Sequence, residues 1–413
     1  MSVTRSAGAG IWLLAGITAA CIAIMLGLLA FTLGSGLASL WPAQVERIEL
    51  RDGTVLLGEV VASDASSLVV RGSEVERVGE GYRRVQRADI GTRDVPRDAV
   101  VLRFDDGRRR FARGDAAPDP ASAAVDVVRP NAMGPLDRTG VFLRDLFAFV
   151  TTSPDASNLS GGVLPALVGT VTLVLLMSVL VMPFGIATAV YLHQRRGPGM
   201  RVVRVAIDTL AGVPAIVYGV LGLGLFVHGI GGSVDRWFHA ERLPVPTFGS
   251  GGLLWAALTL ALLTLPVVVV SVEQGLARIP ASLRAGSLAL GATREETMWR
   301  LLLPAARPAV LTGLILAISR AAGSVAPLML VGMVKLAPAS PLDGAFPYLH
   351  PSRQFMHLGF AVYDAALASP DAIRGVPRAY ACAMLLVGVV IVLNLSAIVL
   401  RNRLRDRYRA LES

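Results

Sequence analysis

The chain has 413 residues, of which 54% are hydrophobic and only 17% are charged. Soluble domains are typically about a quarter charged, so this composition excludes an ordinary soluble protein and favours a membrane protein. The formal net charge of +9 would suggest a nucleic-acid partner for a soluble protein, but the arginines here cluster beside apolar segments, and no nucleic acid is expected to bind.

Lysine and cysteine usage argue against two further classes of protein. The single lysine, Lys335, stands in "MVKLA", whereas a Walker A phosphate loop requires Gly-Lys-Ser/Thr. We therefore expect no ATPase or other enzymatic activity and no cofactor bound by this chain. Cys21 and Cys382 fall in apolar segments and no CxxC or HExxH spacing occurs, so neither a disulfide framework nor a metal site is expected.

Six apolar segments are each long enough to cross the hydrocarbon core, which takes about 20 residues. The sequence therefore predicts an all-α membrane protein with six transmembrane helices. The first segment could be a cleaved signal peptide, but it exceeds the roughly 7–15 apolar residues of a signal sequence, which favours a first membrane helix within residues 1–40. The six segments are Ile11–Leu33, Leu164–Tyr191, Val205–Ile230, Leu253–Val272, Ala309–Val334 and Ala379–Leu400.

Residues 41–138 are mostly polar and are predicted to form a small β-rich extracytoplasmic domain with a linker, inserted between helices 1 and 2. The stretch "VERIELRDGTVLLGEVVASDASSLVVRGSE" alternates apolar and polar residues as strands do, and Asp52-Gly53 is a hairpin signal. With a further strand at Ala99–Phe104, these residues indicate an antiparallel domain over Val45–Phe111, followed by a linker over residues 114–135.

Residues 139–160 are predicted to be an interfacial amphipathic segment. The sequence "TGVFLRDLFAFV" (Thr139–Val150) has a strongly apolar face, which suits a helix lying on the membrane surface. An ordinary helix packed on the bundle fits the same pattern equally well.

Arginine is concentrated in three connections: "HQRRGPGMRVVR" after the second apolar segment, residues 274–308 after the fourth, and "RNRLRDRYR" after the sixth. Short connections rich in arginine remain in the cytoplasm. A six-helix chain then has both termini in the cytoplasm, with a cytoplasmic tail at residues 404–413 and residues 41–160 outside. This arrangement predicts a multi-pass protein of the cell (inner) membrane, whose helices contact the lipid bilayer.

The connection at residues 274–308 carries its own helix signals. Gly291 falls where a glycine would end a helix that begins after Pro280. Thr293 and Glu296 then form the pattern of a capping box for a second helix, which is predicted to run through Met298 and the following leucines until Pro304 disturbs it. An exposed amphipathic helix pair is expected to dock into a partner; packing on lipid headgroups is the alternative.

The spacing from Gly291 to "LLLP" (Leu301–Pro304) resembles the EAA loop of type I ABC import permeases, EAA-x3-G-x9-I-x-L-P. The resemblance implies an ABC transmembrane type-1 permease domain over residues 161–403, whose loop at 274–308 couples to a cytoplasmic ATPase. The family's Glu-Ala-Ala is replaced here by Ala-Gly-Ser. The coupling residues that the resemblance implies are Ala285, Gly286, Ser287, Gly291, Leu301, Leu303 and Pro304.

"AGVPAIVYGVLGLGLF" (Ala211–Phe226) and "GLILAISRAAGSVAPLMLVG" (Gly313–Gly332) narrow the resemblance to phosphate importer permeases of the PstA type, over Leu164–Arg407. The family pattern Arg-x-x-Gly-Glu-Thr-Ala-Pro begins at Arg320, near the middle of the fifth apolar segment. A charge at that depth costs about 2.5–3.5 kcal/mol and marks a functional candidate, although a helix–helix ion pair is an alternative. The implied residues of the translocation path are Arg320, Gly323, Ser324 and Pro327.

Three positions depart from the family pattern. Ser324 replaces the glutamate, Val325 replaces the threonine, and Val270 replaces an arginine that follows the proline of the fourth span. On a continuous helix, a glutamate at position 324 would share a face with Arg320 and partly neutralise it. The serine is therefore expected to leave Arg320 without that partner, unless the partner subunit supplies the missing groups.

The resemblance implies a permease subunit of an ATP-driven phosphate importer, which forms half of the translocation path for inorganic phosphate. The implied partners are a homologous permease subunit of the PstC type, two copies of a cytoplasmic ATPase that uses the ATP, and an extracytoplasmic phosphate-binding protein. A permease for another oxyanion or small solute is one alternative. A transport-inactive, envelope-anchored interaction protein, whose β-rich domain does the work, is another.

Overall fold

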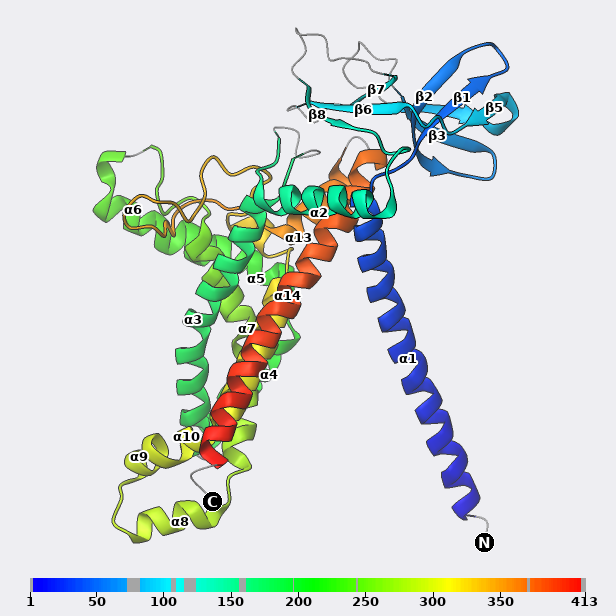
Figure 1. Cartoon of the computed structure of the whole chain (residues 1–413). Helices are drawn as coiled ribbons and strands as arrows, with labels where there is room; N and C mark the ends of the chain where they lie inside the picture. The colour runs from blue at the N-terminus through cyan, green and yellow to red at the C-terminus, as the bar shows by residue number, and fades with distance from the viewer. Residues whose placement is uncertain are drawn as a thin grey trace. The chain divides into compact units, whose positions relative to one another are not determined.

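The structure is a computed structural model that describes residues 3–72, 82–104, 109–114, 124–155, 161–195, 197–242, 244–369 and 372–409 (Figure 1). The chain divides into two compact units. The first comprises Met1–Leu164 with Val362–Met384, and the second comprises Pro165–Ala361 with Leu385–Ser413.

Among the described residues, five helices are long and apolar enough to cross a membrane. A sixth span results if the pair Arg294–Ala305 and Arg307–Ala322, which is bent by 63°, is counted as one. The prediction of a mostly helical, multi-span protein is therefore confirmed, with five or six spans. The five helices are Trp12–Leu40, Leu164–Gln194, Ala215–Phe238, Leu253–Ala277 and Gly375–Arg403.

The predicted bounds of the third span are wrong. Instead of one helix over Val205–Ile230, helix α4 (Pro198–Gly212) ends before Pro214, and the apolar helix begins at Ala215. Proline disfavours the helical conformation of the residue before it, and Val213 is accordingly extended, with φ −69° and ψ 132°.

In the first unit, eight antiparallel strands follow helix α1 (Val3–Leu40) and form two sheets, ordered β4-β3-β2-β1-β5 and β7-β6-β8. The hairpin at Asp52-Gly53 is confirmed: Gly53 has φ +85° between paired strands β1 and β2. The strands are β1 (Val45–Leu50), β2 (Val55–Ser63), β3 (Ser67–Gly72), β4 (Tyr82–Gln86), β5 (Ile90–Asp94), β6 (Ala99–Phe104), β7 (Arg109–Arg113) and β8 (Ala124–Val128).

The two sheets contain two apolar clusters. Ile48, Leu68 and Val70 are buried in the five-stranded sheet. The second cluster combines Val101 and Phe111 of the three-stranded sheet with Val45 of β1. The predicted linker over residues 114–135 is wrong in part, because β8 lies within it and pairs with β6. The alternation "AVDVV" of that strand is too short to be distinguished from a linker without its pairing partner.

Helix α2 (Pro135–Thr151) is held to the three-stranded sheet by charge pairs. The Arg103 Nη1 on β6 donates to both carboxylate oxygens of Asp145 at 2.8 Å, and Arg144 pairs with Asp126 of β8. The helix predicted at Thr139–Val150 is confirmed, since it lies within α2. Leu136, Leu143 and Phe147 remain exposed on one face of it, and whether that face contacts lipid stays a prediction.

The part of α14 (Ala372–Arg409) that belongs to the first unit is fixed by a buried arginine. The Arg378 guanidinium donates to the carbonyls of Gly161 and Gly162 at 2.9 and 3.2 Å, and it lies over the Phe149 ring at 5.6 Å. Asp155 and Asp364 also interact with this charge, so Arg378 is held within the first unit and has a structural role.

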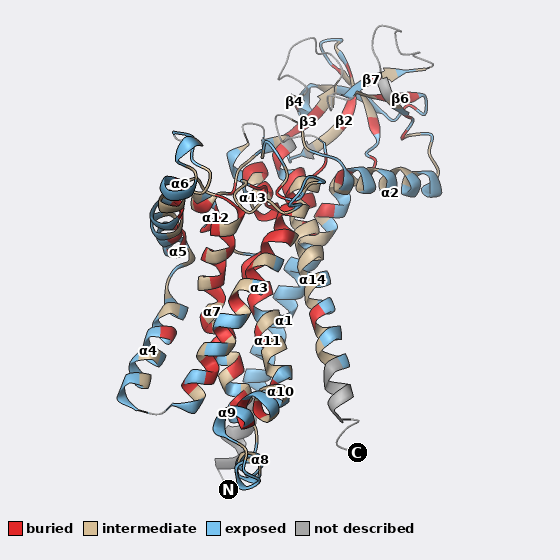
Figure 2. Ribbon diagram, turned by 90° about the vertical axis from the view of Figure 1, so that its left-hand side faces the viewer, coloured by how far each residue is buried: buried red, intermediate tan, exposed pale blue. Residues whose placement is uncertain are grey.

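The second unit is a helical bundle around α7 (Leu253–Ala277), and the buried residues in Figure 2 run along α7 and α3 (Leu164–Gln194). Its core includes Leu173, Met177, Leu260, Leu263 and Phe355. The remaining helical segments are α5 (Ala215–Leu221), η2 (Gly222–Gly231), α6 (Gly232–Phe238), η3 (Ala240–Arg242), α8 (Ala281–Ala289), α9 (Arg294–Glu296), η4 (Thr297–Leu302), α10 (Leu303–Ala305), α11 (Arg307–Ala322), α12 (Leu328–Val331), α13 (Leu358–Tyr363) and η5 (Asp364–Ala368).

Helices α7 and α11 approach each other closely through small residues. A Cβ on Gly275 would lie 2.1 Å from the Cβ of Ala309, and one on Gly313 would lie 3.1 Å from the Cβ of Ser271. The Ser271 hydroxyl also donates to the Ala309 carbonyl at 2.9 Å. Between lipid-embedded helices, such close packing and interhelical hydrogen bonds provide the association that the hydrophobic effect cannot.

Asn131 ties the start of β1 to the connection between β5 and β6, so its removal should loosen this junction. Its amide donates to the carbonyls of Val45 and Pro96 at 2.6 and 2.8 Å and accepts from the Val45 N–H at 3.0 Å. We expect Asn131→Ala to destabilise the junction by about 1–3 kcal/mol, because partly buried backbone groups lose their partners. Hydrogen exchange of β1 in the full-length chain should accelerate, whereas Asn402→Ala in the second unit should leave it unchanged. Equal effects of the two substitutions would contradict this role.

Candidate functional site

Arg320 lies in the last turn of α11, two residues before the helix ends at Ala322. It is partly buried and interacts electrostatically with Tyr218 of α5, whose hydroxyl donates to the Leu210 carbonyl at 2.6 Å. No aspartate or glutamate in the described ranges forms an ion pair with Arg320. The guanidinium is therefore a cation whose hydrogen-bonding capacity is not taken up by a carboxylate of the described chain.

The prediction of one continuous helix over Ala309–Val334 is wrong. Helix α11 ends at Ala322, and the chain is non-helical until α12 begins at Leu328. Arg320 is consequently near a helix end rather than in the middle of a continuous helix. The cause is local: Gly323 disfavours helix, Pro327 cannot donate a helical hydrogen bond, and Ser324 bonds back to the preceding turn.

Ser324 closes the end of α11 instead of continuing it. Its hydroxyl donates to the Arg320 carbonyl at 2.8 Å, and its N–H bonds to the Ala321 carbonyl at 3.0 Å. Because position 324 lies beyond the helix, it does not share a helical face with the Arg320 side chain. The expected i, i+4 pairing of positions 320 and 324 on one helix is therefore wrong for this chain. That position 324 carries no carboxylate follows from the sequence itself.

The break between α11 and α12 is fixed by close packing. A Cβ on Gly219 of α5 would lie 2.8 Å from the Cα of Pro327, and one on Gly359 would lie 2.5 Å from a methyl carbon of Val325. Of the predicted path residues, Pro327 is buried, Ser324 partly buried and Gly323 exposed. Tyr218 and Gly219 were outside the predicted set, although both fall in the quoted stretch Ala211–Phe226, which carried the signal.

The coupling loop has the predicted corner. Helix α8 ends at Ala289, and Gly291 has φ +88°, a left-handed conformation that favours glycine. The capping box is also confirmed: the Glu296 N–H donates to the Thr293 hydroxyl at 3.1 Å, and the Thr293 N–H donates to the Glu296 carboxylate at 3.0 Å. The hydroxyls of Ser287 and Thr297 lie 2.9 Å apart and join the two arms of the corner.

The second arm differs from the single helix predicted to end at Pro304. It combines α9, the π-helical segment η4 and α10, and it continues through Pro304 to Ala305 before the bend into α11. Proline is tolerated there because it occupies the first turn of α10. Met298 and Leu302 are buried in the core of the second unit, so this arm is anchored to the bundle.

The outer surface of the coupling loop is apolar at several positions. Leu290 is 91% exposed, and Leu283, Leu288 and Trp299 are also exposed. Of the predicted coupling residues, Ala285, Gly286 and Gly291 are exposed, whereas Ser287, Leu301, Leu303 and Pro304 are partly buried. Exposed apolar groups gathered on one loop are typical of a protein–protein contact.

Comparison with known proteins agrees with this architecture. Residues 181–410 match the family described as binding-protein-dependent transport system inner membrane component. Because the match covers more than half of the chain, the chain belongs to this family. It therefore has the type I ABC importer permease fold in its helical part and is a multi-span membrane protein.

The chain is similar to two bacterial proteins described as transporter permeases. It is 32% identical over 209 residues to the probable ABC transporter permease YqgH of Bacillus subtilis, covering 50% of this chain and 64% of YqgH. It is 33% identical over 244 residues to the phosphate transport system permease PstA 1 of Mycobacterium tuberculosis, covering 59% of this chain and 71% of PstA 1. The chain is therefore an ABC importer permease similar to PstA phosphate permeases.

Among solved structures, the inward-facing MetNI methionine ABC transporter matches with 18% identity and a TM-score of 0.43, covering 58% of this chain and 94% of that chain. A TM-score of this size does not establish a shared fold by itself. The assignment of the class therefore rests on the family match.

The corner at Gly291 can be tested with a matched pair of substitutions. Neither Gly291 nor Gly286 has an atom within 4 Å of an added Cβ, but only Gly291 has a positive φ. Gly291→Ala should strain the corner by about 1–2 kcal/mol, whereas Gly286→Ala on helix α8 should be neutral or slightly stabilising. Hydrogen exchange of α8 and α9 measures the difference; equal exchange rates in the two variants would show that the corner carries no strain.

Proposed function

We propose that this chain is the permease subunit of an ATP-driven phosphate importer, in which it forms half of the translocation path. The observation that carries the proposal is the Arg320 guanidinium, which lies in the last turn of α11, before the break that precedes α12, without a carboxylate partner in the described chain. Similarity to PstA 1, a phosphate transport system permease, supports the choice of substrate.

The chemistry of guanidinium suits this role. Its planar donors bind two oxygens of a tetrahedral oxyanion at once, and the bonds are strengthened by charge. An arginine within a membrane protein is costly unless it is satisfied, so an anion that passes through the site has a favourable interaction available to it. Gly323, Ser324 and Pro327 would shape the path by ending α11 and by holding the break against α5.

The exposed face of the corner at residues 274–308 would dock on the cytoplasmic ATPase. Leu283, Leu288 and Leu290 would be buried on docking, and the anchoring of Met298 and Leu302 in the bundle would transmit movement of the ATPase to α11. ATP would be used by two ATPase copies and not by this chain. A homologous permease of the PstC type and an extracytoplasmic phosphate-binding protein would complete the importer.

The proposed domain plan follows from these roles. Residues 161–403 would form the permease domain, residues 404–413 a cytoplasmic tail, and residues 41–138 an extracytoplasmic domain after the first membrane helix. Residues 139–160 would lie at the membrane interface. The protein would be in the inner membrane with both termini in the cytoplasm.

A second candidate is a permease for another oxyanion or small solute. It is favoured by the departures at Ser324, Val325 and Val270, which remove a carboxylate, a hydroxyl and a guanidinium that the PstA pattern contains. Without the carboxylate, the site would accept a fully ionised anion with less repulsion. Competition of sulfate and arsenate with phosphate uptake distinguishes the two candidates.

Arg320→Ala should reduce phosphate uptake at least about tenfold while the chain still inserts and assembles, because a charge-assisted hydrogen bond to the anion is lost. Uptake of [32P]phosphate in a strain that lacks its own importer measures this, with chain abundance in the membrane as the control. Arg201→Ala, at an exposed arginine of α4, should have little effect. A loss of abundance that matches the loss of uptake would instead assign Arg320 a structural role.

Ser324→Glu gives a second readout of the same site. A carboxylate at the break after α11 would add a negative charge to the proposed path and should slow uptake of an anion by repulsion, since charges interact strongly where water is scarce. Faster or unchanged uptake would indicate that the partner subunit already supplies the missing group. Unchanged uptake in both variants would remove Arg320 and Ser324 from the path.

The orientation is tested with alkaline phosphatase, which is active only outside the cytoplasm. A fusion after Gly114 should be active and a fusion after Gly197 inactive, because the arginine-rich connections stay inside. Expression of both fusions is verified by immunoblot. The reverse pattern of activity would overturn the proposed orientation.

A further inference from the structure

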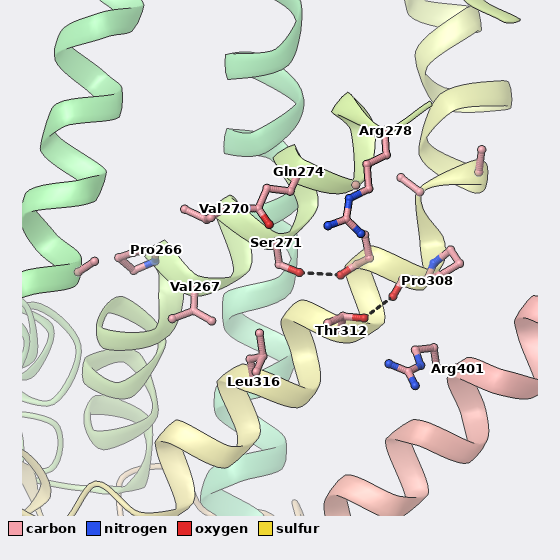
Figure 3. A pocket seen from close by; sticks show the side chains of 15 residues that line it. Pro266, Val267, Val270, Ser271, Gln274, Arg278, Pro308, Thr312, Leu316 and Arg401 are labelled. Atoms are coloured by element: carbon pink, nitrogen blue, oxygen red, sulfur yellow. Dashed lines mark hydrogen bonds between the residues drawn. The ribbon is translucent and has the colours of Figure 1, made fainter. Parts of the chain in front are cut away.

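A cavity of about 710 Å³ lies beside the close contact between α7 and α11 in the second unit (Figure 3). It is at the end of these helices that is joined by the coupling loop. The lining residues are Ala211, Pro266, Val267, Val270, Ser271, Gln274, Gly275, Arg278, Ala305, Ala306, Pro308, Ala309, Thr312, Leu316 and Arg401.

Two arginines from distant parts of the chain border this cavity. Arg278 follows the last residue of α7 and Arg401 lies on α14, and both guanidinium groups point toward the space between the helices in Figure 3. Among the residues that the structure describes, no acidic side chain lines the cavity. In the ranges that the structure covers, neither arginine forms an ion pair, and the nearby Glu273 is already paired with Arg204. Two like charges facing one cavity favour an anion between them.

The remaining polar groups also favour an anion. The hydroxyls of Ser271 and Thr312 donate to the carbonyls of Ala309 and Pro308 at 2.9 and 2.8 Å, so their protons are used within the protein. The side-chain amide of Gln274 lines the cavity and can donate. The available donors that line the cavity are thus the amide and the two guanidinium groups, which match the oxygens of a phosphate group.

The opposite end of the cavity is apolar. Pro266, Val270, Gln274 and Arg278 follow one another at four-residue spacing, so one face of α7 changes from apolar to cationic toward the coupling loop. Leu316 of α11 adds to the apolar end. Such a gradient accommodates an anion with an apolar part as well as a small ion.

We propose that this cavity is a binding site for a phosphate group, held between Arg278 and Arg401 with Gln274 as a further donor. Two sources share this chemistry: inorganic phosphate, and the headgroup of an anionic phospholipid whose acyl chain lies along Val270 and Leu316. The inference rests on the cavity alone, and it holds whether or not Arg320 belongs to a phosphate path.

The test uses the purified full-length chain with Arg320→Ala, which removes any contribution from the proposed path. Equilibrium dialysis with [32P]phosphate measures binding of the free ion. Native mass spectrometry after incubation with phosphatidylglycerol, and separately with zwitterionic phosphatidylcholine, measures retention of lipid. Saturable phosphate binding identifies the ion as the ligand, and selective retention of phosphatidylglycerol identifies the lipid headgroup.

Arg278→Gln with Arg401→Gln should weaken the observed binding about tenfold or more, since charge-assisted hydrogen bonds are lost. The matched control is Arg201→Gln with Arg403→Gln, which removes two exposed arginines outside the cavity and changes the net charge equally. Gln274→Glu should also weaken binding, because the added carboxylate repels the anion. Since Gln274 is exposed, this variant is expected to fold, and it tests the site even if the double variant does not fold. Binding of neither probe, or equal losses in the double variant and its control, would overturn the proposal.

Discussion

The close contact between α7 and α11 is the constraint on which the second unit depends. Gly275 allows Ala309 to approach, and the Ser271 hydroxyl joins the two helices through the Ala309 carbonyl. The coupling loop leaves from the end of α7 and returns into the start of α11, and Arg320 lies at the other end of α11. Helix α11 therefore lies between the coupling loop, with its corner at Gly291, and the break that follows Arg320. A displacement of the loop would be transmitted to Arg320 along this helix.

Arginines without an ion pair in the described residues occur at two places near the ends of α7 and α11. Arg320 lies at the break before α12, and Arg278 with Arg401 borders the cavity near the coupling loop. The PstA pattern has an arginine at the position of Val270, two turns of α7 before Arg278. An anion in this chain would therefore meet cationic groups at different depths from those that the family pattern implies, which is the physical basis for testing the substrate directly.

The β-rich part of the first unit has two apolar clusters of its own. The second cluster combines Val45 of β1 with residues of the three-stranded sheet, which holds α2 through the Arg103–Asp145 pair. These residues lie outside the segment 181–410 that defines the family.

The sequence by itself determined the elements whose signals are local. Apolar length predicted most of the spans, Asp52-Gly53 the first hairpin, and Gly291 with Thr293 and Glu296 the corner, because each depends on neighbouring residues alone. The tertiary structure decided that residues 124–128 pair as a strand and that Arg278 and Arg401 line one cavity. These features depend on partners far along the chain, such as Val101 opposite Val128, and no local pattern encodes such contacts.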